Sequence, residues 1–171
     1  MRTSTVRVGS FGVLVVFLTA GGGALAGEHP RGKSLSDDEV HKLSEQVRTH
    51  CNLPKESDPK VYPWYFHYEL GVALGEKADW SRMVDAISIA LDKREDPAEH
   101  GRTYGMWFLA YRPYYQLGLA QYQLGKYECA ANSFKLSEKL GEFKDDGSHA
   151  SECKERKELQ KTAEEKAQPA K

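Results

Sequence analysis

The chain has 171 residues, of which 40% are hydrophobic, and its formal net charge is −1 at pH 7. A chain of this length forms one compact unit or two small ones. A charge so close to zero gives no electrostatic reason to expect binding to nucleic acid or to an acidic membrane surface.

The first 26 residues have the layout of a secretory signal peptide. Arg2 and Arg7 give a positive start, residues 13–18 form a short apolar core, and Ala24–Ala26 offer small residues at a cleavage point. A membrane anchor over residues 8–27 is the alternative. A spanning helix needs about 20 mostly apolar residues, however, and several glycines interrupt this stretch. We therefore expect an exported chain, periplasmic or extracellular, with no membrane attachment after cleavage.

Segment 27–58 is predicted to contain a capping helix. Ser36 and Glu39 have the spacing of a capping box, in which each side chain satisfies a backbone N–H of the other. Apolar residues then recur at helical spacing as far as Val47, and Pro54 follows the end of the pattern.

Segment 59–146 is predicted to be helical throughout. One helix begins near Pro63, and a second is capped by Asp79 and closed by Pro97. A long helix then follows, and a further one runs from residue 127 to 140. No window shows convincing strand alternation, so the predicted fold class is all-α.

The long helix is predicted from Tyr104 to Tyr122, because aromatic and small residues recur there at steps of three and four. Pro113 lies inside it and cannot donate a backbone hydrogen bond, so we expect a kink or short break. Gly125 is a typical signal for the end of such a helix.

Segment 147–171 is expected to hold a last helix, starting at about Ser148, and a disordered tail. From Lys161 the composition is strongly charged and poor in apolar residues, which favours a solvated and frayed end.

An internal repeat links residues 64–91 to a copy that starts 47 residues later, with no gap. Leu-Gly, an aromatic residue and a series of small and apolar positions all coincide, and this pattern resembles the tetratricopeptide repeat family, in the form of a small exported bacterial-type protein. The residues that carry the resemblance, and that we expect to pack the repeats, are Leu70, Gly71, Trp80, Ile87, Ala90, Leu117, Gly118, Gly125, Tyr127, Ala130 and Phe134.

The resemblance implies a short α-solenoid of two helical hairpins with flanking capping helices. Gly118 and Ala130 would admit bulky side chains where two helices cross. The spacing of 47 residues departs from the family's 34. We interpret the extra residues, between Leu91 and Tyr111, as a lengthened first helix of the second copy.

The resemblance also implies a concave groove that binds a peptide through aromatic contacts. Its predicted lining is Tyr65, Tyr68, Arg112, Tyr115 and Tyr122. The alternative is that most of these side chains belong to the core. Phe66, Trp107 and Phe108 are assigned to packing.

Three cysteines, Cys51, Cys129 and Cys153, would meet oxidising conditions after export, where one disulfide is expected. Cys129 to Cys153 is the favoured pair because it would staple the last helix, although a bond that uses Cys51 stays open. No C-x-x-C spacing and no helical His pair with a nearby carboxylate is present, so we expect no metal and no cofactor.

These observations predict an exported, non-catalytic scaffold that binds an unknown protein or peptide. The alternative is a structural protein that assembles into a homodimer through its aromatic helical faces. An enzyme would need an acid, base or nucleophile converging in one pocket, and the sequence offers no recognisable set.

Overall fold

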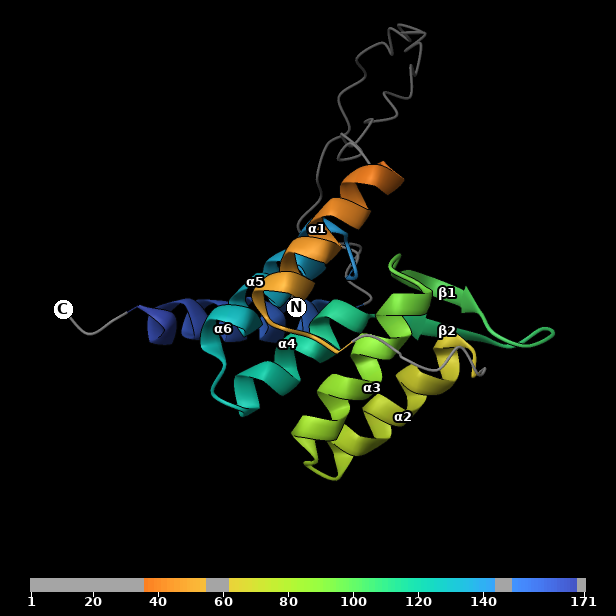
Figure 1. Ribbon diagram of the computed structural model, residues 1–171, viewed down its shortest axis with the longest axis horizontal. Coiled ribbons are helices and arrows are strands. Elements are labelled where there is room, and N and C mark those ends of the chain that lie inside the picture. The colour runs from red at the N-terminus through yellow and green to blue at the C-terminus, as the bar shows by residue number, and fades with distance from the viewer. Residues whose placement is uncertain (1–35, 55–61, 144–148, 169–171) are drawn as a thin grey trace, which may run out of the picture. The chain divides into compact units, whose positions relative to one another are not determined.

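The computed structural model describes residues 36–54, 62–143 and 149–168, all within one compact unit that spans Lys33–Lys171. The predicted signal peptide, and the predicted boundaries at 58/59 and 146/147, lie outside the described residues. The described residues form six helices and one sheet of two strands (Figure 1). The predicted all-α class is confirmed in part, because the described residues are mostly helical but also form this small sheet.

Helix α1 (Asp37–His50) begins with the predicted capping box. The backbone N–H of Glu39 donates to the Ser36 hydroxyl at 3.4 Å, and the Ser36 N–H donates to the Glu39 carboxylate at 2.9 Å. Val40 and Val47 are buried, and the helix packs against α5. The capping box therefore starts a helix that contributes to the core.

Four central helices form two consecutive helical hairpins. The first helix of each hairpin packs against the second, and α3 packs against α4, so the hairpins lie side by side (Figure 1). Their bounds are α2 Trp64–Glu76 and α3 Trp80–Lys93 for the first, and α4 Pro113–Gln123 and α5 Tyr127–Lys139 for the second.

The turns inside the two hairpins have the same geometry. Ala78 has a φ of 58° and Gly125, which lies 47 positions later, has a φ of 74°. In each turn the following residue donates its N–H to the carbonyl oxygen five positions back, at 2.9 Å. This arrangement is the Schellman motif that commonly ends a helix.

The helices of each hairpin approach closely at a glycine. A Cβ atom placed on Gly71 would lie 2.6 Å from Cδ1 of Ile87, and one placed on Gly118 would lie 2.7 Å from Cε1 of Phe134. Both large side chains are fully buried. The same small-to-large contact therefore recurs at the 47-residue spacing.

A second contact recurs with its sizes exchanged. A Cβ atom on Gly75 would lie 2.7 Å from Sδ of Met83, which is buried on α3. At the equivalent positions the second hairpin has Tyr122 on α4 and a fully buried Ala130 on α5. In the first hairpin the bulky residue, Met83, lies on the second helix, whereas in the second hairpin the bulky residue, Tyr122, lies on the first helix. This exchange explains why Met83 replaces the small residue of the repeat pattern.

Most residues assigned to repeat packing lie inside. Leu70 is different, because 41% of its surface is exposed, and its assignment to packing is wrong. It precedes Gly71, and adjacent helical residues point about 100° apart, so a chain that turns Gly71 toward α3 turns Leu70 toward solvent. Gly125 is also exposed, because it forms the turn and packs against nothing. The buried set is Gly71, Ile87, Ala90, Leu117, Gly118, Ala130 and Phe134, with Trp80 and Tyr127 half-buried.

Residues 98–111 form a β-hairpin, and the predicted lengthened helix is wrong. Strand β1 (Ala98–Arg102) pairs antiparallel with β2 (Phe108–Tyr111). Aromatic residues favour strands, and Gly105, with a φ of 62°, supplies the turn. Helix α4 starts at Pro113, a first-turn position at which the missing N–H removes no helical hydrogen bond.

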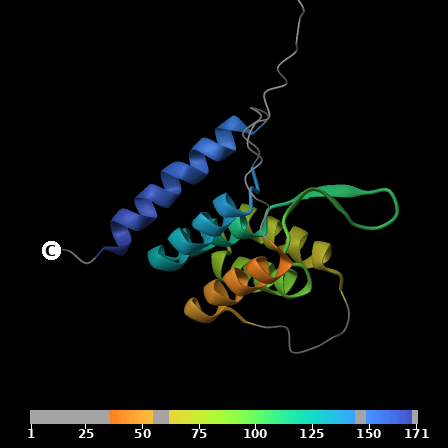
Figure 2. The ribbon, with the colours of Figure 1, turned by 90° about the horizontal axis from the view of Figure 1, so that it is seen from above.

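Helix α6 (Ala150–Ala167) packs against α5 and continues well past Lys161, so the prediction of a disordered tail is wrong for residues 161–167 (Figure 2). Ala163 is fully buried, and buried Arg156 donates to the carbonyl oxygen of Phe134 and to the carboxylate of Glu138. These contacts hold a helix that composition alone does not favour.

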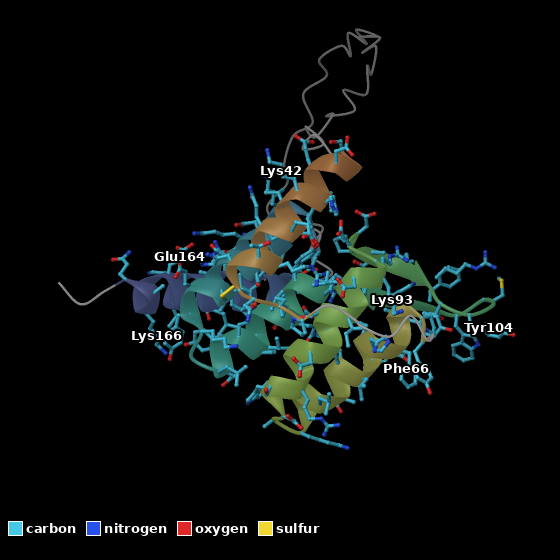
Figure 3. The ribbon with its side chains drawn as sticks, viewed as in Figure 1. Lys42, Phe66, Lys93, Tyr104, Glu164 and Lys166 are labelled. Atoms are coloured by element: carbon cyan, nitrogen blue, oxygen red, sulfur yellow. A yellow bond between two sulfur atoms is a disulfide. The ribbon has the colours of Figure 1, made fainter. Side chains whose placement is uncertain are left out.

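A disulfide joins Cys51, directly after α1, to Cys129 in the first turn of α5 (Figure 3). The favoured pairing of Cys129 with Cys153 is therefore wrong. Cys129 packs against the cluster that contains Val47, whereas Cys153 is buried with Ala130 in the cluster beneath α6. Cys129 and Ala130 are adjacent on α5 but pack against different clusters, and Cys129 is the one that lies on the side of α1.

Candidate functional site

The predicted groove residues do not form one open surface. Tyr68 and Tyr115 are buried, so the structure corrects their assignment to an exposed lining. The Tyr68 hydroxyl accepts the backbone N–H of Arg112 at 3.2 Å, and burial raises the pKa of Tyr68 to about 12. The Tyr115 ring packs edge-on against Phe143, with centroids 5.1 Å apart.

The other three predicted groove residues are half-buried in separate surroundings. The Arg112 guanidinium lies 4.6 Å from the ring centroid of Phe143. Tyr65 packs edge-on against Trp64. Tyr122 packs edge-on against Tyr127, and Nζ of Lys166, near the end of α6, lies 4.9 Å from the Tyr122 ring centroid. Their positions support packing roles.

The β-hairpin carries the most exposed apolar side chains described. We define the hairpin tip as Tyr104, Met106, Trp107 and Phe108, whose exposed fractions are 79%, 82%, 77% and 52%. The tip extends away from the helices in Figure 2, and Tyr104 is labelled in Figure 3. The assignment of Trp107 and Phe108 to packing is therefore wrong.

The turn that presents the tip is held by local hydrogen bonds. The N–H of Thr103 donates to the carbonyl oxygen of Trp107 at 2.9 Å, and the Thr103 hydroxyl donates to the same oxygen at 3.0 Å. Nε of Arg102 donates to the carbonyl oxygen of Gly105 at 2.9 Å. The turn is thus ordered before any partner arrives.

The base of the hairpin is fixed to the helical body. Tyr111 is fully buried, its ring centroid lies 4.5 Å from that of Trp64, and its hydroxyl donates to the carbonyl oxygen of Arg94 at 2.7 Å. The Arg94 guanidinium in turn covers the Trp64 ring at 4.7 Å. Gly101 leaves room for Trp64, because a Cβ atom there would lie 2.9 Å from the indole.

A second exposed apolar strip starts just before α2 and continues along it. We define the α2 strip as Tyr62, Phe66 and Leu70, which follow one another at intervals of four and are 56%, 44% and 41% exposed. Tyr62 and Phe66 stack with centroids 4.5 Å apart. Phe66, labelled in Figure 3, was assigned to packing, and this assignment is also wrong.

A cluster of charged groups joins β1, α4 and α6. Nη2 of Arg112 lies 3.4 Å from Oε1 of Glu99 and 2.9 Å from Nε2 of His149, and that imidazole nitrogen lies 3.1 Å from the same carboxylate oxygen. All three side chains are partly buried. These contacts link the β-hairpin to the start of α6, and this structural role explains why the three side chains lie together.

The buried carboxyl of Glu142 closes the N-terminus of α4. Its two oxygens accept the N–H groups of Tyr114 and Tyr115, both at 2.8 Å. Burial raises the pKa of Glu142 to about 7, against the opposing effect of these hydrogen bonds. A carboxyl with such a pKa suits acid–base catalysis. Because backbone donors occupy both oxygens, the geometry supports helix capping instead.

Within residues 36–54, 62–143 and 149–168, no three His, Cys, Asp or Glu side chains gather closely enough to hold a metal ion. No helix in this described part of the chain combines the length and the apolar composition needed to cross a bilayer. Comparisons with protein-family models, with curated proteins and with solved structures find no match for the chain.

Sequence reasoning missed the hairpin tip although a signal was available. Between Thr103 and Tyr111 the chain has no charged residue, and Gly105 divides this stretch near its start. A glycine just before an uncharged run that is rich in aromatic residues is consistent with a turn that leads into a strand. The same aromatics also recur at helical spacing, which is the signal that predicts the wrong structure here.

Proposed function

We propose that this chain is an exported, non-catalytic scaffold that binds another protein through the hairpin tip. The observation that carries the proposal is the exposure of four large apolar side chains on an ordered turn. Exposed apolar groups gathered in this way mark interaction sites. Tyr and Trp are also enriched among the residues that dominate binding energy.

The rigidity of the tip supports the same role. Binding is weakened when loops and side chains must be ordered on contact. Here the hydrogen bonds of Thr103 and Arg102 hold the turn, and the buried Tyr111 anchors its base. A partner with an apolar pocket would meet a surface that is already shaped.

For the scaffold, we propose two tetratricopeptide-like repeats in a short α-solenoid, flanked by α1 and α6. The recurring contacts of Gly71 with Ile87 and of Gly118 with Phe134 support this proposal, as do the matching turns. Helix α6 packs against α4 and α5 in the manner of a terminal cap, and α1 packs against α5 as well. The proposed binding surface is then an addition to the repeat, and it replaces the concave groove.

Export remains part of the proposal. The disulfide between Cys51 and Cys129 is compatible with the oxidising conditions outside the cytoplasm. The mass of the protein recovered from its producing cells tests this point directly. Cleavage after Ala26 predicts a chain that begins at Gly27, and an intact Met1 in the exported fraction would contradict it.

The binding proposal is tested by replacing Tyr104 and Trp107 together with Ala. Capture of the partner from the exported fraction should fall by more than tenfold, because each anchor of this type contributes about 2 kcal/mol. The matched control is Leu124→Ala, which removes a 38% exposed apolar side chain at the end of α4. Equal capture by the double variant and the control, with unchanged helicity, would contradict the proposal.

The α2 strip favours a second candidate function, self-assembly into a dimer. Phe66 and Leu70 lie on one exposed face, and apolar helical faces commonly pair in homodimers. Sedimentation over a range of concentrations distinguishes the two functions. Self-assembly predicts a dimer that Phe66→Ser with Leu70→Ser dissociates and that the tip variants leave intact.

A further inference from the structure

A groove of about 450 Å³ separates α1 from α5, away from the hairpin tip. Leu43 and Val47 of α1 and Leu136 of α5 line it with apolar surface, and all three belong to the larger core cluster or pack against it. This volume falls within the range of about 300 to 1,000 Å³ that is typical of ligand sites.

The permanently charged side chains that line the groove are both lysines. Lys135 and Lys139 stand one turn apart on α5, and His50 faces them from α1, whereas no Asp or Glu lines the groove. Lys135 meets Glu164 at 3.1 Å and His50 meets Glu128 at 3.1 Å, but both pairs are solvent-exposed. Exposed pairs are worth about 0–1 kcal/mol, so an incoming carboxylate can replace these partners.

Acidic groups lie near the groove but do not line it. Glu39 lies within electrostatic range of Lys139, and its carboxylate accepts hydrogen bonds from Ser36 in the capping box. The groove thus combines an apolar floor with two lysines on its rim, and the carboxylates that neighbour these lysines are exposed and can be exchanged for those of a ligand. The complementary ligand has an apolar face and carboxylates beside it.

The walls of the groove are fixed in place. The disulfide ties the end of α1 to the first turn of α5. Beside it, the buried Arg48 meets Asp92 of α3 at 2.8 Å. A site that is built in advance loses little free energy to ordering on binding.

We propose that this groove binds an acidic amphipathic helix of a partner protein. The lining spans positions 43–50 of α1 and 132–139 of α5, which at 1.5 Å per residue is about 10 Å, or two helical turns. Apolar side chains at helical spacing would pack on Leu43, Val47 and Leu136, and flanking carboxylates would meet Lys135 and Lys139. This mode is helix-in-groove recognition. The proposal extends the proposed protein-binding function to a second surface and does not depend on the tip.

The probe is a fluorescent peptide of sequence LEELLEELLEEL, capped at both ends, titrated against the oxidised full chain. Anisotropy should show saturable binding. Two control peptides separate the contributions of charge and apolar surface, one with Lys in place of every Glu and one with Ser in place of every Leu. Each control should bind at least tenfold more weakly.

Charge reversal at the rim provides the decisive variant. Lys135→Glu with Lys139→Glu should weaken the acidic peptide at least tenfold and strengthen the basic one, whereas Lys161→Glu, an exposed control on α6, should change neither. Absence of binding by the acidic peptide, or binding that the reversal does not alter, would overturn the proposal.

A second variant covers the case in which charge reversal disturbs the fold. Leu43→Gln, at a half-buried position of the floor, should weaken the acidic peptide without changing helicity. The tip variants should leave peptide binding unchanged. Loss of partner capture in those variants therefore tests the proposed function separately from the groove.

Discussion

Replacing Gly118 with Ala tests whether the second hairpin depends on close helix contact. The new Cβ atom would lie 2.7, 2.8 and 3.1 Å from three ring carbons of Phe134, well inside the carbon separation of about 3.5–4.0 Å at which packing is favourable. The ring has no free space to move into, because Phe134 is fully buried and packs against Tyr115.

Two opposing terms set the size of the effect. Overpacking a core costs about 1–3 kcal/mol. The change from Gly to Ala inside a helix stabilises by about 1 kcal/mol. We therefore expect Gly118→Ala to lower the free energy of unfolding by up to about 2 kcal/mol.

A double-mutant cycle with Phe134→Leu isolates the packing term. Leu removes the ring carbons that collide, and the helix-propensity gain cancels because it appears in both arms. The coupling free energy should be about 1–3 kcal/mol, with the Ala less destabilising in the Leu background. Urea unfolding of the oxidised chain, followed by circular dichroism, measures it. A coupling below about 0.5 kcal/mol would refute the close approach of α4 and α5 at Gly118.

Three further measurements address the turns, the buried carboxyl and the disulfide. Ala78→Gly should raise the free energy of unfolding by about 1 kcal/mol and Gly125→Ala should lower it by a similar amount, because both positions have positive φ; thermal melts check the opposite signs. The folded-state pKa of Glu142, about 7, lies above its ordinary value, so its contribution to stability is fully present below about pH 4.5 and is lost as pH rises through 7. Glu142→Gln should remove a slope of at most about 1.4 kcal/mol per pH unit between pH 5 and 7, and an unchanged slope would count against burial. Replacing Cys51 and Cys129 with Ser opens a loop of 78 residues and should lower stability by about 4 kcal/mol, and full stability of the double variant in urea would contradict the assigned bond.

The sequence predicts correctly those features of the fold that depend on residues close together in the chain, such as helix caps. Ser36 and Glu39 form their capping box, and Asp79 accepts the backbone N–H of Arg82, because a cap involves only residues a few positions apart. Gly71 and Gly118 occupy equivalent positions in the two copies of the repeat, and this coincidence predicts that they lie where two helices pack closely. Both face large side chains in the structure.

The rest depended on contacts that spacing does not encode. Whether Cys129 meets Cys51 or Cys153 is decided by which face of α5 each cluster covers. The sequence pattern allows both a groove role and a core role for Tyr68 and Tyr115. The structure places Tyr68 against Tyr111 and Tyr115 against Phe143, contacts that the pattern does not encode. The order of α6 likewise comes from Arg156 and Ala163, whose burial needs α5.

The hairpin is the most informative failure, because it lies where the internal repeat departs from the tetratricopeptide pattern that it resembles. The two copies are 47 residues apart, against 34 in that pattern, and the β-hairpin that ends in the tip lies between them. Inside the repeats, rings such as Phe134 are buried against small residues and are needed for packing. In the insertion, Trp107 contributes nothing to the core, yet its backbone is ordered by hydrogen bonds. The exposed Trp107 ring adds little to the stability of the fold, and stability alone does not explain why its turn is ordered. A binding partner best accounts for both features.

We therefore predict that Trp107→Ala leaves the free energy of unfolding within about 0.5 kcal/mol of the parent while it impairs capture. A loss of 2 kcal/mol or more in stability would return Trp107 to the packing role that the sequence suggested.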